Sequence, residues 1–185
     1  MNKEELRKQY LSIRNSIIHK DYKSNIICNK IINDKDFINS NVVALYKSLK
    51  CEVNTDKLIS YCIKNRKILL LPVIDNGNMY FYKVNDKTKY VKSNFGIYEP
   101  VNSDIFLDKN KIDIMIVPGV CFDLYKNRIG FGKGYYDKYL IDSNINTVGI
   151  CFDSQITNKQ ITNNNYDVKV KRLISEKRSL WYNWL

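Results

Sequence analysis

The residues best suited to chemistry lie together in one glycine-rich segment, residues 128–137. It reads Arg-Ile-Gly-Phe-Gly-Lys-Gly-Tyr-Tyr-Asp and holds three of the seven glycines in the chain, Gly130, Gly132 and Gly134. A backbone without Cβ atoms can approach an anion closely and present successive N–H groups to it. Arg128 and Lys133 add positive charge, and Asp137 adds a carboxylate of the kind that holds Mg²⁺ against phosphates. The segment therefore predicts a phosphate-binding site.

The glycine spacing alone does not decide this, because a tight structural turn is the better explanation of the bare pattern. G-x-G-x-G differs from the dinucleotide motif G-x-G-x-x-G, and it differs from the P-loop, in which Gly-Lys is followed by Ser or Thr. The two cations and the carboxylate around the glycines favour an anion site over a simple turn.

The elements around this segment follow an α/β pattern. Apolar strands are predicted at 42–46, 68–72, 112–117, 147–152 and 168–174, with an antiparallel strand at 79–84 after the turn Asp75-Asn76-Gly77-Asn78. Helices are predicted at 21–33, after Thr55 or Asn54, and at 135–140. We therefore expect a single three-layer α/β/α domain over residues 1–185, with a mixed, mostly parallel central sheet.

The first predicted helix, residues 2–19, brings cations beside its apolar face. Leu6 and Tyr10 recur at helical spacing, and at about 100° per residue Lys3, Arg7 and Arg14 fall within about 40° of one another next to that face. These three cations share one edge of the helix, close to the core.

Composition limits the function classes. The chain has 185 residues and a net charge of +11, which would suit a polyanion, but its basic residues are scattered, as on a solvated lysine surface. A single histidine, His19, argues against a histidine-based metal site or a Ser/His/Asp triad. Five cysteines without C-x-x-C spacing indicate reduced thiols and a cytoplasmic protein. No signal peptide or membrane span is expected.

A longer motif resembles a known family. Residues 128–140, with Pro118-Gly-Val-Cys-Phe-Asp123 before them, resemble the signature of the 5-formyltetrahydrofolate cyclo-ligases, also called 5,10-methenyltetrahydrofolate synthetases. Shorter matches run along nearly the whole chain: Lys3-x-x-Leu6-Arg7, Glu52-Val53-x-Thr55, Leu71-Pro72, Phe95-Gly96-Ile97-x-Glu99-Pro100 and Asp167.

The resemblance implies an enzyme that uses ATP to cyclise 5-formyltetrahydrofolate (folinic acid) to 5,10-methenyltetrahydrofolate, releasing ADP and phosphate. In that chemistry the γ-phosphoryl group goes to the formyl oxygen, N10 attacks the activated carbon, and phosphate leaves. ATP is a co-substrate, Mg²⁺ a cofactor, and the reduced folate can carry a polyglutamate tail. We expect a monomer without a nucleic-acid or membrane partner.

The resemblance also implies roles for individual residues. The ATP contacts would be Lys3, Arg7, Arg128, Gly130, Gly132, Lys133, Gly134, Tyr135 and Tyr136. The folate contacts would be Lys47, Glu52, Phe131, Gly132, Lys133, Gly134 and Tyr135. The Mg²⁺ ligands would be Asp137 and Asp167.

Two alternatives stay open at this point. The net charge and the fourteen tyrosines could serve a basic nucleic-acid-binding module, with tyrosines as stacking platforms. The same loop could also serve a kinase or an ATP-dependent ligase that acts on another small acceptor. The C-terminal Trp181-Tyr182-Asn183-Trp184 is expected to pack on the core.

Overall fold

The computed structural model describes residues 2–93, 96–101 and 103–181. Phe95 of the family motif and residues 182–184, expected on the core, lie outside these ranges. The helices are α1 (Lys3–Ser16), α2 (Lys20–Ile32), α3 (Lys35–Asn39), α4 (Asp56–Lys64) and α5 (Tyr135–Leu140), with short 3₁₀ helices at Lys109–Lys111 and Asp153–Gln155. The strands are β1 (Val42–Ala44), β2 (Ile68–Asp75), β3 (Asn78–Val84), β4 (Lys89–Lys92), β5 (Tyr98–Val101), β6 (Ile114–Val117), β7 (Cys121–Asp123), β8 (Arg128–Ile129), β9 (Asn146–Ile150), β10 (Ile156–Thr157), β11 (Arg172–Ile174) and β12 (Ser179–Leu180).

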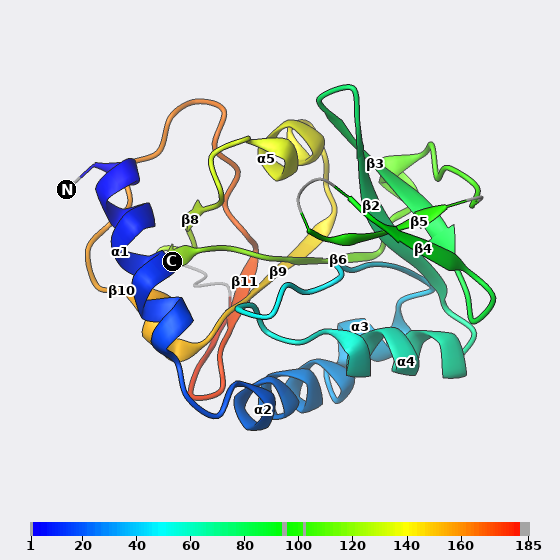
Figure 1. Cartoon of the computed structure of the whole chain (residues 1–185), viewed down its shortest axis with the longest axis horizontal. Helices are drawn as coiled ribbons and strands as arrows, with labels where there is room; N and C mark the ends of the chain where they lie inside the picture. Colours follow the sequence, from blue (N-terminus) through cyan, green and yellow to red (C-terminus); the bar gives the residue numbers. More distant parts are fainter. Residues whose placement is uncertain (1, 94–95, 102, 182–185) are drawn as a thin grey trace.

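Seven of these strands form the central sheet, in the order β12-β11-β9-β6-β1-β2-β3. Its five inner strands are parallel, and the two edge strands, β3 and β12, are antiparallel to their neighbours. Helices α2, α3 and α4 cover one face, and α5 lies on the other (Figure 1). The expected α/β fold with a mixed, mostly parallel sheet is confirmed.

Helix α1 packs against a second, smaller sheet that the sequence did not predict. This sheet has the order β10-β7-β8. A capping box starts the helix, because the Asn2 side chain accepts from Glu5 N–H while the Glu5 carboxylate accepts from Asn2 N–H, each at 2.9 Å. Leu6 and Tyr10 are buried against Val120, Cys121, Ile129 and Ile161. The apolar face of α1 thus fixes its charged edge beside the segment that leads out of β8.

The order of the central strands places a topological switch point, here called the crevice, between β1 and β6. From β1 the chain moves to β2 and β3 on one side, whereas from β6 it moves to β9, β11 and β12 on the other. Connections that diverge from two adjacent parallel strands leave space at the carboxyl ends of those strands, where α/β proteins bind ligands. Glu52 follows β1 and Gly119 follows β6, so both lie at this edge.

Candidate active site

The glycine-rich segment forms an exposed loop between β8 and α5. Gly132 has a φ of +98° and Gly134, the N-cap of α5, has a φ of +68°. Side chains rarely tolerate these backbone conformations, which explains glycine at both positions. Phe131 and Lys133 are exposed on the loop. Among the described residues, none forms a hydrogen bond or ion pair with the Lys133 side chain.

Helix α1 lies directly against this loop through Arg7. The Arg7 Nε donates a hydrogen bond of 2.9 Å to the carbonyl oxygen of Gly130. A Cβ on Gly132 would lie 3.3 Å from the guanidinium carbon of Arg7, so the two groups are in close contact. The predicted phosphate cation on α1 and the predicted phosphate loop are therefore neighbours in space.

The remaining predicted cations are paired with the two predicted magnesium carboxylates. Arg128 is 8% exposed, and its Nη2 lies 2.8 Å from Asp137 Oδ1. Lys3 forms an ion pair with Asp167, and the backbone N–H of Val168 donates to Asp137 Oδ1 at 3.2 Å. The two carboxylates thus come from neighbouring segments, although they are 30 positions apart in the sequence. Each of the two predicted magnesium carboxylates is thus paired with one predicted phosphate cation.

These neighbours lower the pKa of the Asp167 carboxyl. Burial alone would raise its pKa, but the hydrogen bonds from Lys3 and from the Asn164 N–H, with the charges of Lys3 and Arg128, lower the pKa below its ordinary value. Asp167 is therefore a carboxylate at neutral pH, as a metal ligand must be.

Glu52 lies on the other side of the crevice and is 8% exposed. Its Oε2 accepts a hydrogen bond of 2.9 Å from the Leu49 N–H, and its Oε1 lies 3.5 Å from Arg14 Nη1. Burial raises the pKa of Glu52, and this effect outweighs the Leu49 hydrogen bond and the Arg14 charge, which lower it. The pKa values of Tyr46 and Tyr136 are also raised, first by burial and then by the charge of Glu52. A buried carboxylate beside two phenols suits the recognition of ligand N–H groups.

Comparison with known proteins agrees with this geometry. The sequence model of the 5-formyltetrahydrofolate cyclo-ligase family matches residues 1–176. The chain belongs to this cyclo-ligase family. A relative from Schizosaccharomyces pombe, a probable 5-formyltetrahydrofolate cyclo-ligase, is 33% identical over 175 residues, which cover 85% of this chain and 86% of the relative. The 5-formyltetrahydrofolate cyclo-ligase of Mus musculus is 27% identical, over 83% of this chain and 82% of its own.

Two solved structures share the cyclo-ligase fold. The NMR structure of Aquifex aeolicus 5,10-methenyltetrahydrofolate synthetase has a TM-score of 0.86 at 32% identity, over 97% of this chain and 92% of its own. The synthetase from Mycoplasma pneumoniae has a TM-score of 0.77 at 25% identity, over 95% and 99% of the two chains. The residues matched by the family model, 1–176, include the glycine loop, Glu52 and Gly119.

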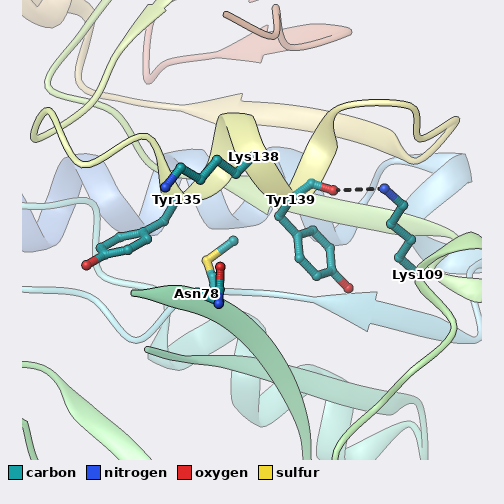
Figure 2. A pocket seen from close by; sticks show the side chains of 6 residues that line it. Asn78, Lys109, Tyr135, Lys138 and Tyr139 are labelled. Carbon is teal, nitrogen blue, oxygen red and sulfur yellow. Dashed lines mark hydrogen bonds between the residues drawn. The ribbon is translucent and has the colours of Figure 1, made fainter. Parts of the chain in front are cut away.

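Tyr135 lines a hollow between α5 and the start of β3 (Figure 2). The hollow has a volume of about 180 Å³ and is lined by Asn78, Met79, Lys109, Tyr135, Lys138 and Tyr139. Lys109 closes one end, where its Nζ donates to the carbonyl oxygens of Ile141 at 2.8 Å and Tyr139 at 3.4 Å. Tyr135 therefore lines this hollow, whereas the next residue, Tyr136, lies near Glu52 and Arg128.

Lys47, another predicted folate contact, is paired with a carboxylate at the start of α4. Its ammonium group forms an ion pair with Asp56, the first residue of α4, at 2.5 Å. A contact between Lys47 and folate stays a prediction.

Sequence reasoning missed three residues that hold this cyclo-ligase site in place. The Gln155 amide donates to the carbonyl oxygens of Gly119 and Val120, each at 3.0 Å, and so fixes the chain after β6. The fully buried Asp123 accepts from the backbone N–H groups of Tyr125, Asn127 and Ile161 and from the Asn127 amide. Asp123 was recognisable only as part of the motif, and nothing in the sequence marks Gln155. The third residue is Arg14, which the helix pattern places beside Arg7 without a role.

Proposed function

We propose that this chain is an ATP-dependent 5-formyltetrahydrofolate cyclo-ligase that makes 5,10-methenyltetrahydrofolate, ADP and phosphate. One observation supports this most: the glycine loop has Arg7, Arg128 and Lys133 along its length and the buried Glu52 across the crevice. The cations suit ATP phosphates, and the carboxylate suits the N–H groups of a pterin. One loop can therefore bring both reactants together.

The chemistry follows from that placement. The formyl oxygen attacks the γ-phosphorus, the bond from that phosphorus to the bridging oxygen breaks, and ADP leaves with the electron pair. N10 then attacks the activated formyl carbon, N10 loses its proton, and the carbon–oxygen bond breaks to release phosphate. Phosphoryl transfer depends mainly on positioning and on cations around the oxygens, and little acid–base catalysis is required. A site without histidine is adequate for this reaction.

Asp137 and Asp167 are the carboxylates that would hold Mg²⁺. Among the described residues no group of three or more His, Cys, Asp or Glu side chains could bind a metal by itself. Two oxygen ligands from neighbouring segments nevertheless fit Mg²⁺, which is usually held by one or two carboxylates together with substrate phosphates. When bound, the metal neutralises charge on the phosphates. Lys3 and Arg128 are paired with these carboxylates. When the carboxylates bind Mg²⁺, both cations would be released to contact the phosphates.

Asp137→Asn should raise the Mg²⁺ concentration for half-maximal rate by about 3- to 10-fold, because a neutral amide is a poorer ligand for a hard cation. Asp167→Asn should give a smaller increase. Magnesium titrations of the cyclisation rate and of ATP binding measure both effects. Asp108→Asn, at an exposed site away from the loop, is the control. An unchanged Mg²⁺ dependence in both variants would mean that the phosphates alone hold the metal.

Gly132→Ala should raise the KM for ATP by about 10-fold, because the new Cβ would press on the Arg7 guanidinium and the φ of +98° disfavours alanine. Gly77→Ala is a matched control, since Gly77 has a φ of +78° but no atom within 4 Å of the added Cβ. It should lose similar stability and keep the wild-type KM. Equal ATP KM values in the two variants would contradict the contact between Arg7 and ATP.

We further propose a monomer that works in the cytoplasm, with a reduced folate as substrate. All five cysteines are free thiols, and four of them are buried, in keeping with a reducing compartment. Among the described residues no helix is long and apolar enough to cross a membrane.

The test of the function is an absorbance assay. The amidinium of methenyltetrahydrofolate is a conjugated chromophore that folinic acid lacks. Purified protein with ATP, Mg²⁺ and folinic acid should develop this absorbance, and omission of any one component should abolish it. ATP hydrolysis with other acceptors and none with folinic acid would favour the kinase alternative. Tight binding of single-stranded nucleic acid without cyclisation would favour the nucleic-acid module.

A further inference from the structure

Arg14 is a fully buried cation in the last turn of α1, and it lies across the crevice between β1 and β6. Its exposed fraction is 0%. Its Nη1 is 3.5 Å from Glu52 Oε1 on the β1 side and 3.5 Å from the carbonyl oxygen of Gly119 on the β6 side. Its Nη2 donates to Cys51 Sγ at 3.0 Å. One guanidinium therefore joins the two loops that diverge at the carboxyl edge of the sheet.

The same guanidinium also supports the glycine loop. Its central carbon lies 5.0 Å from the centre of the Phe131 ring, within the range of a cation–π contact. Phe131 is otherwise 52% exposed, so Arg14 is a support beneath a ring that faces solvent. Glu52 and Phe131, both predicted folate contacts, thus meet at Arg14, although they are 79 positions apart in the sequence.

The ion pair of Arg14 is longer than that of Arg172, another buried arginine of this chain. Charged hydrogen bonds are normally about 2.7–2.9 Å long, whereas Arg14 lies 3.5 Å from its carboxylate, and no described residue accepts a hydrogen bond from its Nε. Burial of a cation with such incomplete pairing is costly. Arg172 differs in the length of its ion pair, because it is 2% exposed and pairs with Asp34 at 2.9 Å, although no described residue accepts a hydrogen bond from its Nε or Nη2. Arg172 lies at the start of β11, which is at the opposite edge of the sheet from the crevice.

We propose that Arg14 is a positioning residue that holds the Glu52 carboxylate and the Phe131 ring where they meet the pterin of 5-formyltetrahydrofolate. This inference rests on the proposed function and extends it to a residue outside the predicted ATP and folate contacts. Arg14 touches neither reactant in this scheme. It acts through Glu52 and Phe131, whereas Lys3 and Arg7 on the same helix edge serve ATP.

The inference predicts a change in folate binding with pH. The charged and titratable groups around Glu52 are Arg14 on α1, Cys51 beside it, Tyr46 after β1 and Tyr136 on α5. Burial raises the pKa of both tyrosines, so neither ionises in the acidic range. Arg14 lowers the pKa of Glu52, so its removal should protonate Glu52 at a higher pH. The loss of folate binding on acidification should then begin at a higher pH.

Equilibrium binding of folinic acid without ATP provides the test, with Arg14→Met and Arg14→Lys as variants. Arg14→Met should raise the Kd for folinic acid by about 10- to 100-fold, shift the acidic loss of binding to higher pH, and leave the Kd for ATP within about threefold. Arg14→Lys keeps the charge but cannot bridge both sides of the crevice, and should raise the folinic acid Kd by at least about threefold.

Arg172→Met is the matched control, because it also removes a buried guanidinium. It should lower the melting temperature and leave folinic acid binding unchanged. If Arg14→Met binds folinic acid like wild type with the same pH profile, Arg14 is structural and the inference is wrong. If Arg14→Met does not fold, wild-type affinity in Arg14→Lys overturns the inference. Failure of the wild-type protein itself to bind folinic acid would instead refute the proposed function.

Discussion

Lys133→Ala should lower the cyclisation rate by about 100- to 1000-fold and leave the melting temperature unchanged. Fixed cations that face developing charge contribute about this much in other enzymes. Lys133 is exposed at the tip of the glycine loop, and no partner for its ammonium group is recorded among the described residues. Its loss therefore removes charge from the phosphate site and nothing from the core. The measurements are the initial rate at saturating ATP and folinic acid, and thermal unfolding.

Two further variants provide comparisons for Lys133→Ala. Lys8→Ala removes a lysine of α1 whose side chain is 80% exposed and whose ion pair with Glu4 is 3.9 Å long, so it should leave the rate unchanged. Arg128→Ala should lower both the rate and the stability, because Arg128 is buried and paired with Asp137. Near wild-type turnover in Lys133→Ala would show that the loop does not bind ATP through this lysine.

Glu52→Gln should raise the KM for folinic acid by about 10- to 100-fold and leave the KM for ATP within about threefold, provided that KM follows binding. Glutamine keeps the shape and one acceptor oxygen, but it places an amide where a pterin N–H would meet a carboxylate. The hydrogen bond that is lost belongs to the charged class, worth about 1.5–3 kcal/mol. Titrations with each ligand separately measure the two effects. Equal weakening for both ligands, or for neither, would make Glu52 a structural residue.

The stability of Glu52→Gln at different pH values gives an independent check on the buried state of Glu52. Burial raises the pKa of Glu52 in the folded state above its value in the unfolded chain. A raised pKa in the folded state stabilises the protein below the unfolded-state pKa, and this stabilisation is lost as pH rises through the folded-state pKa. Above its folded-state pKa an ionised Glu52 therefore costs stability that a neutral glutamine does not. We expect the free energy of unfolding of the wild-type protein, relative to that of Glu52→Gln, to decrease as pH rises from the acidic range.

The sequence was sufficient for the elements with strong local signals. The helix at 135–140 and the antiparallel strand after the turn at 75–78 are present at or within one residue of the predicted bounds. The small sheet was not predictable, because β7, β8 and β10 have only two or three residues each, too few to show a period. The first helix also ends earlier than predicted, at Ser16, because Ile17 has an extended backbone.

The sequence pointed to the candidate site residues one by one, but it did not show which of them pair in the structure. The helical period placed Lys3, Arg7 and Arg14 on one edge of α1, and family resemblance supplied Glu52 and the loop. The pairing of Lys3 with Asp167 and of Arg14 with Glu52 depends on how distant segments pack, which no local pattern encodes. Lys47 shows the same limit, since its partner is Asp56 at the start of the next helix.

The most direct measurement follows the formyl oxygen of the substrate. Folinic acid labelled with ¹⁸O at the formyl group is converted with ATP and Mg²⁺, and the released phosphate is analysed by mass spectrometry. If the γ-phosphoryl group is transferred to the formyl oxygen in this site, each methenyltetrahydrofolate formed should be matched by one phosphate that carries the label. Unlabelled phosphate, with the label in water, would contradict phosphoryl transfer to the folate and with it the central claim that one loop brings ATP and folate together for reaction.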